Sequence, residues 1–159
     1  MVGESTFATV AAAMVTASFP FYLVGAWIIL DSEVVTWSVL TRHLAFIVVG
    51  LVLTTVPVVG WMVPRLLGQL GGLSALHAVL GLQAYALLAF ALTGIVRILQ
   101  VKRKHNLYSD PDADVAIDDL HENMGAWRGR LRIGVFGYVL FWIAAYLLGI
   151  YRYLTIYVL

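Results

Sequence analysis

Four stretches without a charged side chain constrain this chain more than any other feature of its sequence. They cover residues 7–30, 44–64, 73–96 and 133–151, and charged residues separate them. An α-helix needs about 20 residues to cross a hydrocarbon core of about 30 Å, and each stretch has that length. Lipid offers no water to the backbone amides, so a crossing segment of this kind must be a helix. The sequence therefore predicts an all-α membrane protein with four transmembrane helices in an antiparallel bundle.

The composition agrees with a surface that faces lipid. Hydrophobic residues make up 62% of the 159 residues and charged residues only 12%. A soluble domain has about 45–50% hydrophobic and roughly 25% charged residues. This length favours one domain, so residues 1–159 are expected to form one transmembrane domain. The chain has no cysteine, which excludes disulfides, thiolate metal sites, iron–sulfur ligation and c-type haem attachment. The expected spans are about 7–30, 44–64, 73–100 and 131–152.

Local signals refine these spans. Three glycines between residues 68 and 72 predict a turn before the third span, which is therefore expected to start near Leu73. Pro20 and Pro57 lie inside spans, where neighbouring helices can satisfy the freed carbonyl groups, and they predict kinks. Residues 1–6 contain no basic side chain, and the apolar run that follows is too long for a signal-peptide core. We expect the first span to be a retained helix.

The basic residues predict the orientation, because cytoplasmic loops of membrane proteins are enriched in Lys and Arg. The opposite side has only Arg65 and Arg152 near the ends of the spans. The sequence thus predicts a multi-pass plasma-membrane protein with both termini outside and loops 31–43 and 101–130 in the cytoplasm. The basic residues of the predicted cytoplasmic loops are Arg42, Lys102, Arg103, Lys104, Arg128, Arg130 and, at the start of the fourth span, Arg132.

The connection before the fourth span contains a helix-start signal. Asp110-Pro111 opens it, and the acidic residues that follow suit the positive end of a helix dipole. We expect an amphipathic cytoplasmic helix that leads into the fourth span. Its apolar stripe would consist of Val115, Leu120, Met124 and Trp127.

Histidines at helix ends are the candidate cofactor ligands, because neutral imidazole is the usual ligand of haem iron. His43 and His121 are expected on the cytoplasmic side, and His77 on the outer side. Each shares a helix face with a glycine four or seven residues later. A glycine there lacks the side chain that would keep a flat macrocycle away. These glycines are Gly50 after His43, Gly81 after His77 and Gly125 after His121.

Each histidine also has a structural interpretation, and the sequence leaves both open. His43 can be an interfacial polar residue at a helix end, and His77 can be a deeper residue paired with Ser74 or Gln83. His121 can be a residue on the surface of a helix. Glycine is common in membrane helices for close packing alone, so the spacing by itself does not decide.

Other chemistry is not indicated. There is no phosphate-binding glycine loop, no histidine pair of a metalloprotease helix and no nucleophile elbow, so we expect no independent catalytic activity. No Asp, Glu or Lys lies in the middle of a span, which argues against a proton-coupled transporter. Residues 102–104, with His105 beside them, favour a topology signal or a contact with anionic lipid over a nucleic-acid site.

Placed on helices, these histidines resemble two kinds of four-helix membrane protein. The segments Arg42-His43, Leu76-His77 and His121 with Trp127 are similar to a family associated with cytochrome oxidase assembly. The chain departs from that family at residues 61–65, where the family has a histidine and this sequence has none. His77 to Gly81 and His121 to Gly125 are similar to the His–Gly helices of transmembrane b-type cytochromes. The bias toward Arg and Asp also resembles haloarchaeal membrane proteins of unknown function that accompany cytochrome bc-type complexes.

These resemblances imply an accessory protein of the respiratory electron-transfer chain, which would be an electron-transfer subunit or an assembly factor. Its partners would be the lipid bilayer and other membrane subunits of a respiratory complex, without nucleic acid. If haem b is bound, His43 and His121 would be its axial ligands, and Arg42 or Arg128 would pair with its propionates. The alternative is a cofactor-free structural subunit or scaffold that packs against a larger membrane complex.

Overall fold

The computed structural model describes the chain except for residues 1–2, 67, 69–70 and 110–116, and its described residues contain no strand. Four helices are long and apolar enough to cross a membrane, so the predicted all-α membrane architecture is confirmed. The helices are α1 (Glu4–Leu30), α2 (Trp37–Pro57), the short α3 (Val63–Leu66), α4 (Gly72–Lys104) and α5 (Met124–Tyr153). π-helical turns continue α2 over Val58–Met62 and α5 over Leu154–Val158, and a 3₁₀ turn covers Ile117–Leu120.

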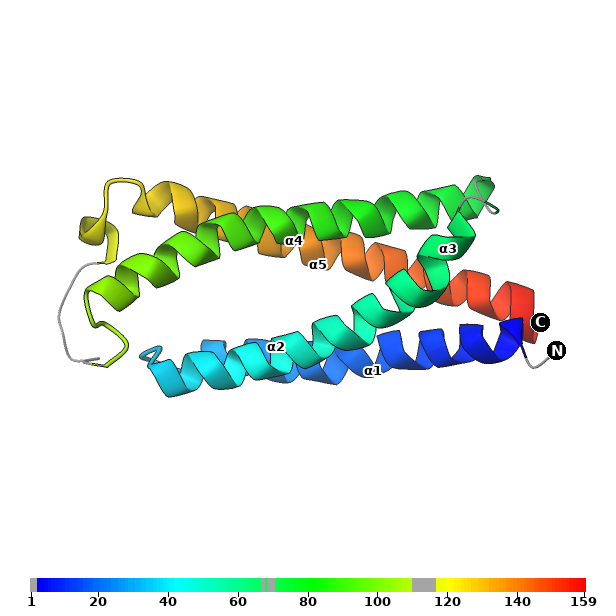
Figure 1. Ribbon diagram of the computed structural model, residues 1–159, viewed down its shortest axis with the longest axis horizontal. Helices are drawn as coiled ribbons and strands as arrows, with labels where there is room; N and C mark the ends of the chain where they lie inside the picture. Colours follow the sequence, from blue (N-terminus) through cyan, green and yellow to red (C-terminus); the bar gives the residue numbers. More distant parts are fainter. Residues whose placement is uncertain (1–2, 67, 69–70, 110–116) are drawn as a thin grey trace.

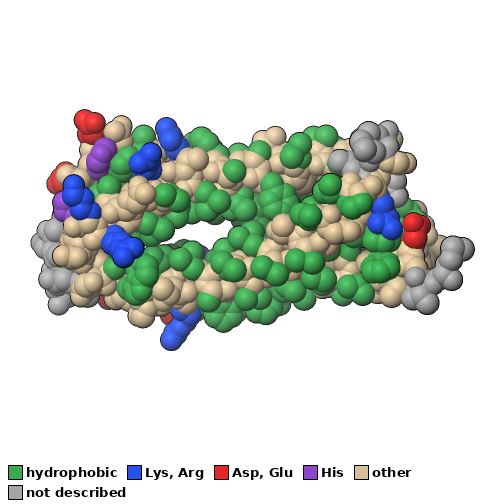
Figure 2. Space-filling view, viewed as in Figure 1, with side chains coloured by type: hydrophobic (Ala, Val, Ile, Leu, Met, Phe, Trp, Pro, Cys, Tyr) green, Lys and Arg blue, Asp and Glu red, His purple; other side chains and the backbone are tan. Residues whose placement is uncertain are grey.

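The bundle consists of two antiparallel hairpins, α1 with α2 and α4 with α5 (Figure 1). Both chain termini lie at one end, and the α1–α2 and α4–α5 connections lie at the other, which we call the loop end. α2 runs diagonally, beside α1 at the loop end and toward the start of α4 at the terminal end. Lys and Arg side chains gather at the loop end (Figure 2). The hairpins are therefore close at the terminal end, separate between α2 and α4 farther along the bundle, and meet again at the loop end, where Trp37 packs on Tyr108.

Small residues bring α4 and α5 close together. A Cβ atom on Gly94 would lie 2.4 Å from the carbonyl oxygen of Trp127, and one on Gly134 would lie 2.6 Å from the Cβ of Ala91. Ala91 is fully buried at this contact. Since lipid is as apolar as the side chains, membrane helices associate by such close packing rather than by the hydrophobic effect.

Aromatic residues and hydroxyl pairs connect the two hairpins. Tyr138 and Trp142 of α5 form the core with Ala84, and Tyr22 of α1 packs against them. The Tyr22 hydroxyl lies 3.1 Å from that of Tyr138 in the other hairpin and 3.2 Å from that of Thr54 in its own. Hydrogen bonds of this kind contribute about 0.6 kcal/mol each in membrane proteins. Three further hydroxyl pairs follow the same pattern: Tyr85 with Thr55, Tyr146 with Thr16 and Tyr153 with Thr9.

The helices extend beyond the predicted spans, mainly at the loop end. α2 begins at Trp37 instead of residue 44, because the Thr36 side chain accepts a hydrogen bond from the Val39 amide and caps the helix. α4 continues to Lys104 and α5 begins at Met124. At the other end, α4 begins at Gly72, one residue before the predicted start, and Gly72 has a positive φ of 52°.

The segment in which an amphipathic helix was expected before the fourth span is described only in part. Residues 110–116 lie outside the described residues, and a 3₁₀ turn occupies Ile117–Leu120. Met124 and Trp127, expected on the apolar stripe of that helix, belong to the first turn of α5. Met124 is fully buried there.

Candidate functional site

His43 lies near the start of α2 and is half-buried against α1. Its Nδ1 atom is 2.7 Å from the carbonyl oxygen of Gly25. A carbonyl can only accept, so Nδ1 carries the proton and Nε2 presents the lone pair of the neutral ring. Metal-binding histidines commonly have this tautomer, with the second nitrogen hydrogen-bonded to a carbonyl group. His43 therefore has the tautomer that suits an Nε2 ligand.

His121 has the opposite arrangement. It precedes α5, and its Nδ1 atom accepts a hydrogen bond of 3.0 Å from the Asn123 amide. The neutral ring therefore carries its proton on Nε2. The ring also packs on Trp127, with 4.5 Å between the ring centroids. For Nε2 to bind a metal, the proton would have to move to Nδ1 and the bond from Asn123 would be lost.

Gly50 does not provide the open space that the sequence suggested. A Cβ atom there would lie 2.8 Å from Cε1 of Tyr22, so the phenol ring already covers this glycine. Gly50 instead allows α1 to approach α2. By contrast, no heavy atom of a neighbouring side chain or helix lies within 4 Å of a Cβ built on Gly81 or Gly125.

His77 lies in the second turn of α4, at the terminal end of the bundle and far along it from the loop end. Its expected partners were Ser74 or Gln83, but its Nδ1 atom lies 3.1 Å from a guanidinium nitrogen of Arg152. Guanidinium has donors only, so Nδ1 of His77 accepts. The ring fits over Gly149, whose built Cβ would be 3.0 Å from Nε2. His77 thus holds α4 and α5 together.

The two arginines proposed to pair with propionates are both at the loop end. Arg42 is exposed and borders a shallow hollow of about 210 Å³ between the end of α1 and the start of α2, together with Asp31. Arg128 is half-buried in the second turn of α5. No group of three or more His, Asp or Glu side chains that would hold a metal ion occurs in the described part of the chain.

The structure places His43 and His121 at the same end of the bundle, as predicted, and His77 at the other. The predicted bis-histidine haem fits this arrangement poorly, because His121 has the wrong tautomer and Tyr22 covers Gly50. The ligand roles of these histidines remain predictions. In the structure, His43 and His77 each contact a neighbouring helix, and His121 contacts residues of its own turn and the start of α5.

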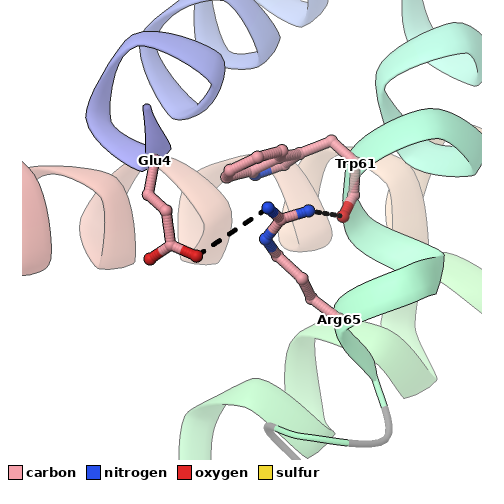
Figure 3. A network of polar contacts seen from close by, with 3 residues as sticks. All are labelled: Glu4, Trp61 and Arg65. Carbon is pink, nitrogen blue, oxygen red and sulfur yellow. Dashed lines mark hydrogen bonds and ion pairs between the residues drawn. The ribbon is translucent and has the colours of Figure 1, made fainter. Parts of the chain in front are cut away.

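A cluster at the terminal end was missed in the sequence (Figure 3). The Arg65 guanidinium lies 3.2 Å above the Trp61 ring and donates to the Trp61 carbonyl oxygen over 3.3 Å. Its other terminal nitrogen is 3.8 Å from a carboxylate oxygen of Glu4. Phe7 of α1 stacks on the same indole. The spacing of four residues between Trp61 and Arg65, which places them on one helix face, was the available signal.

Comparison with known proteins gives the family of the chain. Neither the curated proteins nor the solved structures contain a match to it. A family model described as "Domain of unknown function (DUF7321)" matches residues 4–158, which include all four long helices. The resemblance to cytochrome oxidase assembly proteins and to b-type cytochromes therefore stays a prediction. The chain belongs to the DUF7321 family.

Proposed function

We propose that this chain is a non-catalytic accessory membrane protein of the respiratory electron-transfer chain, acting as a structural subunit or an assembly factor. This proposal rests on the contacts that the candidate cofactor residues make within the fold. His43 is bonded to α1, His77 to α5 and His121 to its own turn, and Tyr22 covers Gly50. Residues engaged in this way favour a packing role over an electron-carrying role.

The respiratory context rests on the resemblance of Arg42-His43 and Leu76-His77 to the cytochrome oxidase assembly family. Within that context, the basic loop end supports a plasma-membrane orientation with both termini outside, because Lys and Arg favour the cytoplasmic side. The larger membrane partner would then meet this chain through its lipid-facing helices. Many large apolar side chains remain exposed there, including Leu82, Phe136 and Leu140.

A haem-binding role is the second candidate, and one observation favours it. The Gly25 carbonyl fixes His43 in the tautomer with a free lone pair on Nε2. Haem b would supply one-electron transfer if bound, and His43 would be its ligand from this chain. Arg42, one residue earlier and exposed, would pair with a propionate.

The main proposal is tested in membranes from cells that lack the chain. Respiratory complexes are separated on native gels and stained for haem, and oxygen uptake is measured. We expect loss of one complex in the deletion strain and its recovery with the wild-type chain. Recovery with His43→Ala indicates a structural role, while failure of that folded variant indicates an electron-carrying role. An unchanged set of complexes with unchanged oxygen uptake would overturn the proposal.

A visible spectrum separates the two candidates independently. The detergent-purified wild-type chain is recorded oxidised and then reduced, beside His43→Ala and, as a matched control, His105→Ala. His105 is exposed at the end of α4. A Soret band that His43→Ala alone removes would establish haem ligation. A wild-type chain without that band after expression with ample haem would rule it out.

A further inference from the structure

The hollow beside Arg42 is lined from two sides by side chains of opposite charge. It lies at the loop end, where the α1–α2 connection joins the two helices (Figure 1), and its volume is about 210 Å³. α1 contributes Trp27 to its lining, and the connection contributes Asp31 and Ser32. α2 contributes Ser38 and Arg42, which are one helical turn apart. An acidic and a basic side chain thus border the same hollow.

These two charges do not neutralise each other. No ion pair joins the Asp31 carboxylate to the Arg42 guanidinium, although both border the hollow. Neither side chain forms a hydrogen bond or an ion pair with any other residue that the structure describes. Two separated charges of opposite sign are complementary to a ligand that carries both signs. The hollow therefore suits a zwitterion.

The hydrogen-bonding groups show which end of a zwitterion each side would take. Ser32 donates its proton to the Ile28 carbonyl oxygen over 2.7 Å, so its oxygen can only accept from a ligand. Together with the Asp31 carboxylate it offers acceptors to a cation that has N–H groups. Arg42 has donors only and suits an anion with several oxygens, such as a phosphate. The matching ligand has a primary ammonium group and a phosphate.

The two charges also lie at different depths along the bundle. The His43 ring contacts the carbonyl oxygen of Gly25, so residue 43 of α2 is roughly level with residue 25 of α1. Asp31 comes six residues after Gly25, and a helix rises about 1.5 Å per residue. The backbone of Arg42, which precedes His43, is therefore roughly 7–8 Å deeper in the bundle than that of Asp31.

This order is the order of groups in an amino-phospholipid, in which the phosphate follows the hydrocarbon chains and the ammonium group is outermost. On α1, Trp27 lies one turn before Asp31, and Leu23 lies one turn before Trp27. Both apolar side chains are 67% exposed. Tryptophan is typical of the membrane–water interface. Exposed apolar side chains, then Arg42 and then Asp31 thus follow one another toward the loop end.

We propose that this hollow binds the phosphoethanolamine headgroup of a membrane phospholipid, with the phosphate at Arg42 and the ammonium group at Asp31 and Ser32. A phosphatidylcholine headgroup has no N–H donor for these acceptors, and a phosphatidylglycerol headgroup has no cation for Asp31. The site does not depend on the proposed respiratory role. The phosphate takes the place of the propionate that the haem candidate assigns to Arg42.

Lipid binding is measured on the full-length chain in detergent, stripped of lipid and titrated with phosphatidylethanolamine, phosphatidylcholine or phosphatidylglycerol. Native mass spectrometry counts the bound lipids. We expect one phosphatidylethanolamine per chain, held roughly tenfold more tightly than either other lipid, because one charge-assisted hydrogen bond is added. Asp31→Asn should remove this preference and leave phosphatidylglycerol binding unchanged. Arg42→Gln should weaken both of these lipids, because both contain the phosphate.

Two charges outside the hollow provide matched controls. Glu33→Gln removes an exposed carboxylate of the same connection, and Arg103→Gln removes an exposed guanidinium from the last turn of α4. Neither residue borders the hollow, so both variants should bind phosphatidylethanolamine as the wild-type chain does. Equal losses in Asp31→Asn and Glu33→Gln, or equal affinities of the wild-type chain for the three lipids, would overturn the proposal.

Carbodiimide coupling locates the ammonium group directly. The reagent joins a carboxylate to a primary amine in contact with it, as an amide with loss of water. In vesicles of phosphatidylethanolamine and phosphatidylglycerol, we expect a lipid adduct on Asp31 of the wild-type chain. The yield should fall in Arg42→Gln, which keeps the carboxylate, and stay unchanged in Arg103→Gln. Equal labelling of Asp31 and Glu33, or an equal yield with soluble glycerophosphoethanolamine, would refute the lipid site.

Discussion

Gly94→Ala tests whether close packing of α4 on α5 holds the second hairpin together. The added Cβ would lie 2.4 Å from the Trp127 carbonyl oxygen, and ordinary contact begins near 3.4 Å, so the backbones must separate by about 1 Å. A gap of that size removes a quarter to a half of the attraction between neighbouring atoms. Overpacking of this kind costs about 1–3 kcal/mol. We expect the free energy of unfolding to fall by that amount.

The assay is reversible unfolding by SDS in mixed micelles, followed by the fluorescence of tryptophans such as Trp127 and Trp142. Gly81→Ala is the matched control on the same helix, because nothing lies within 4 Å of its added Cβ. Alanine favours helix by up to about 1 kcal/mol over glycine, so this control should be neutral or stabilising. Equal stabilities of the Gly94 and Gly81 variants would refute the packing argument.

Three other substitutions have defined outcomes in the same unfolding assay. His43→Ala removes the hydrogen bond to the Gly25 carbonyl and should lower the free energy of unfolding by about 0.5–1.5 kcal/mol. An unchanged free energy of unfolding would show that this bond does not stabilise the fold. Tyr138→Phe removes the hydroxyl pair with Tyr22 and should lower the free energy of unfolding by about 0.6 kcal/mol, and by no more than about 2 kcal/mol. A larger decrease would mean that the ring had moved. Burial raises the pKa of Tyr108 above 10.0, so the folded state keeps a proton that the unfolded state loses. The contribution of this group to stability should therefore be constant below pH 10 and fall above it. Tyr108→Phe should remove this contribution and make the fall above pH 10 smaller, and an unchanged pH profile would contradict the assignment.

The sequence predicted the spans because a long run of apolar residues has few alternatives to a membrane helix. At the loop end it predicted helices that were too short, because a helical turn with polar side chains does not stand out in a hydropathy profile. Trp37 to His43 is such a turn, and the side chain of Thr36 starts it. A reading of Thr36 as an N-cap would have located this end.

The candidate site was harder to predict, because the partners of its residues are distant in the chain. The His–Gly spacing was compatible with a cofactor and with packing. Only the fold shows that Tyr22 covers Gly50 and that the partner of His77 is Arg152, on another helix. The tautomers of His43 and His121 likewise depend on contacts that no local pattern contains.

The division of the bundle into two hairpins bears on how the protein enters the membrane. Each hairpin has its own glycine contacts, Gly25 and Gly50 in the first and Gly94 and Gly134 in the second. Each hairpin therefore contains the close contacts that pair its own two helices, and we expect it to form them without the other. Two fragments cut in the turn before Gly72 and produced together should reassemble into the same bundle.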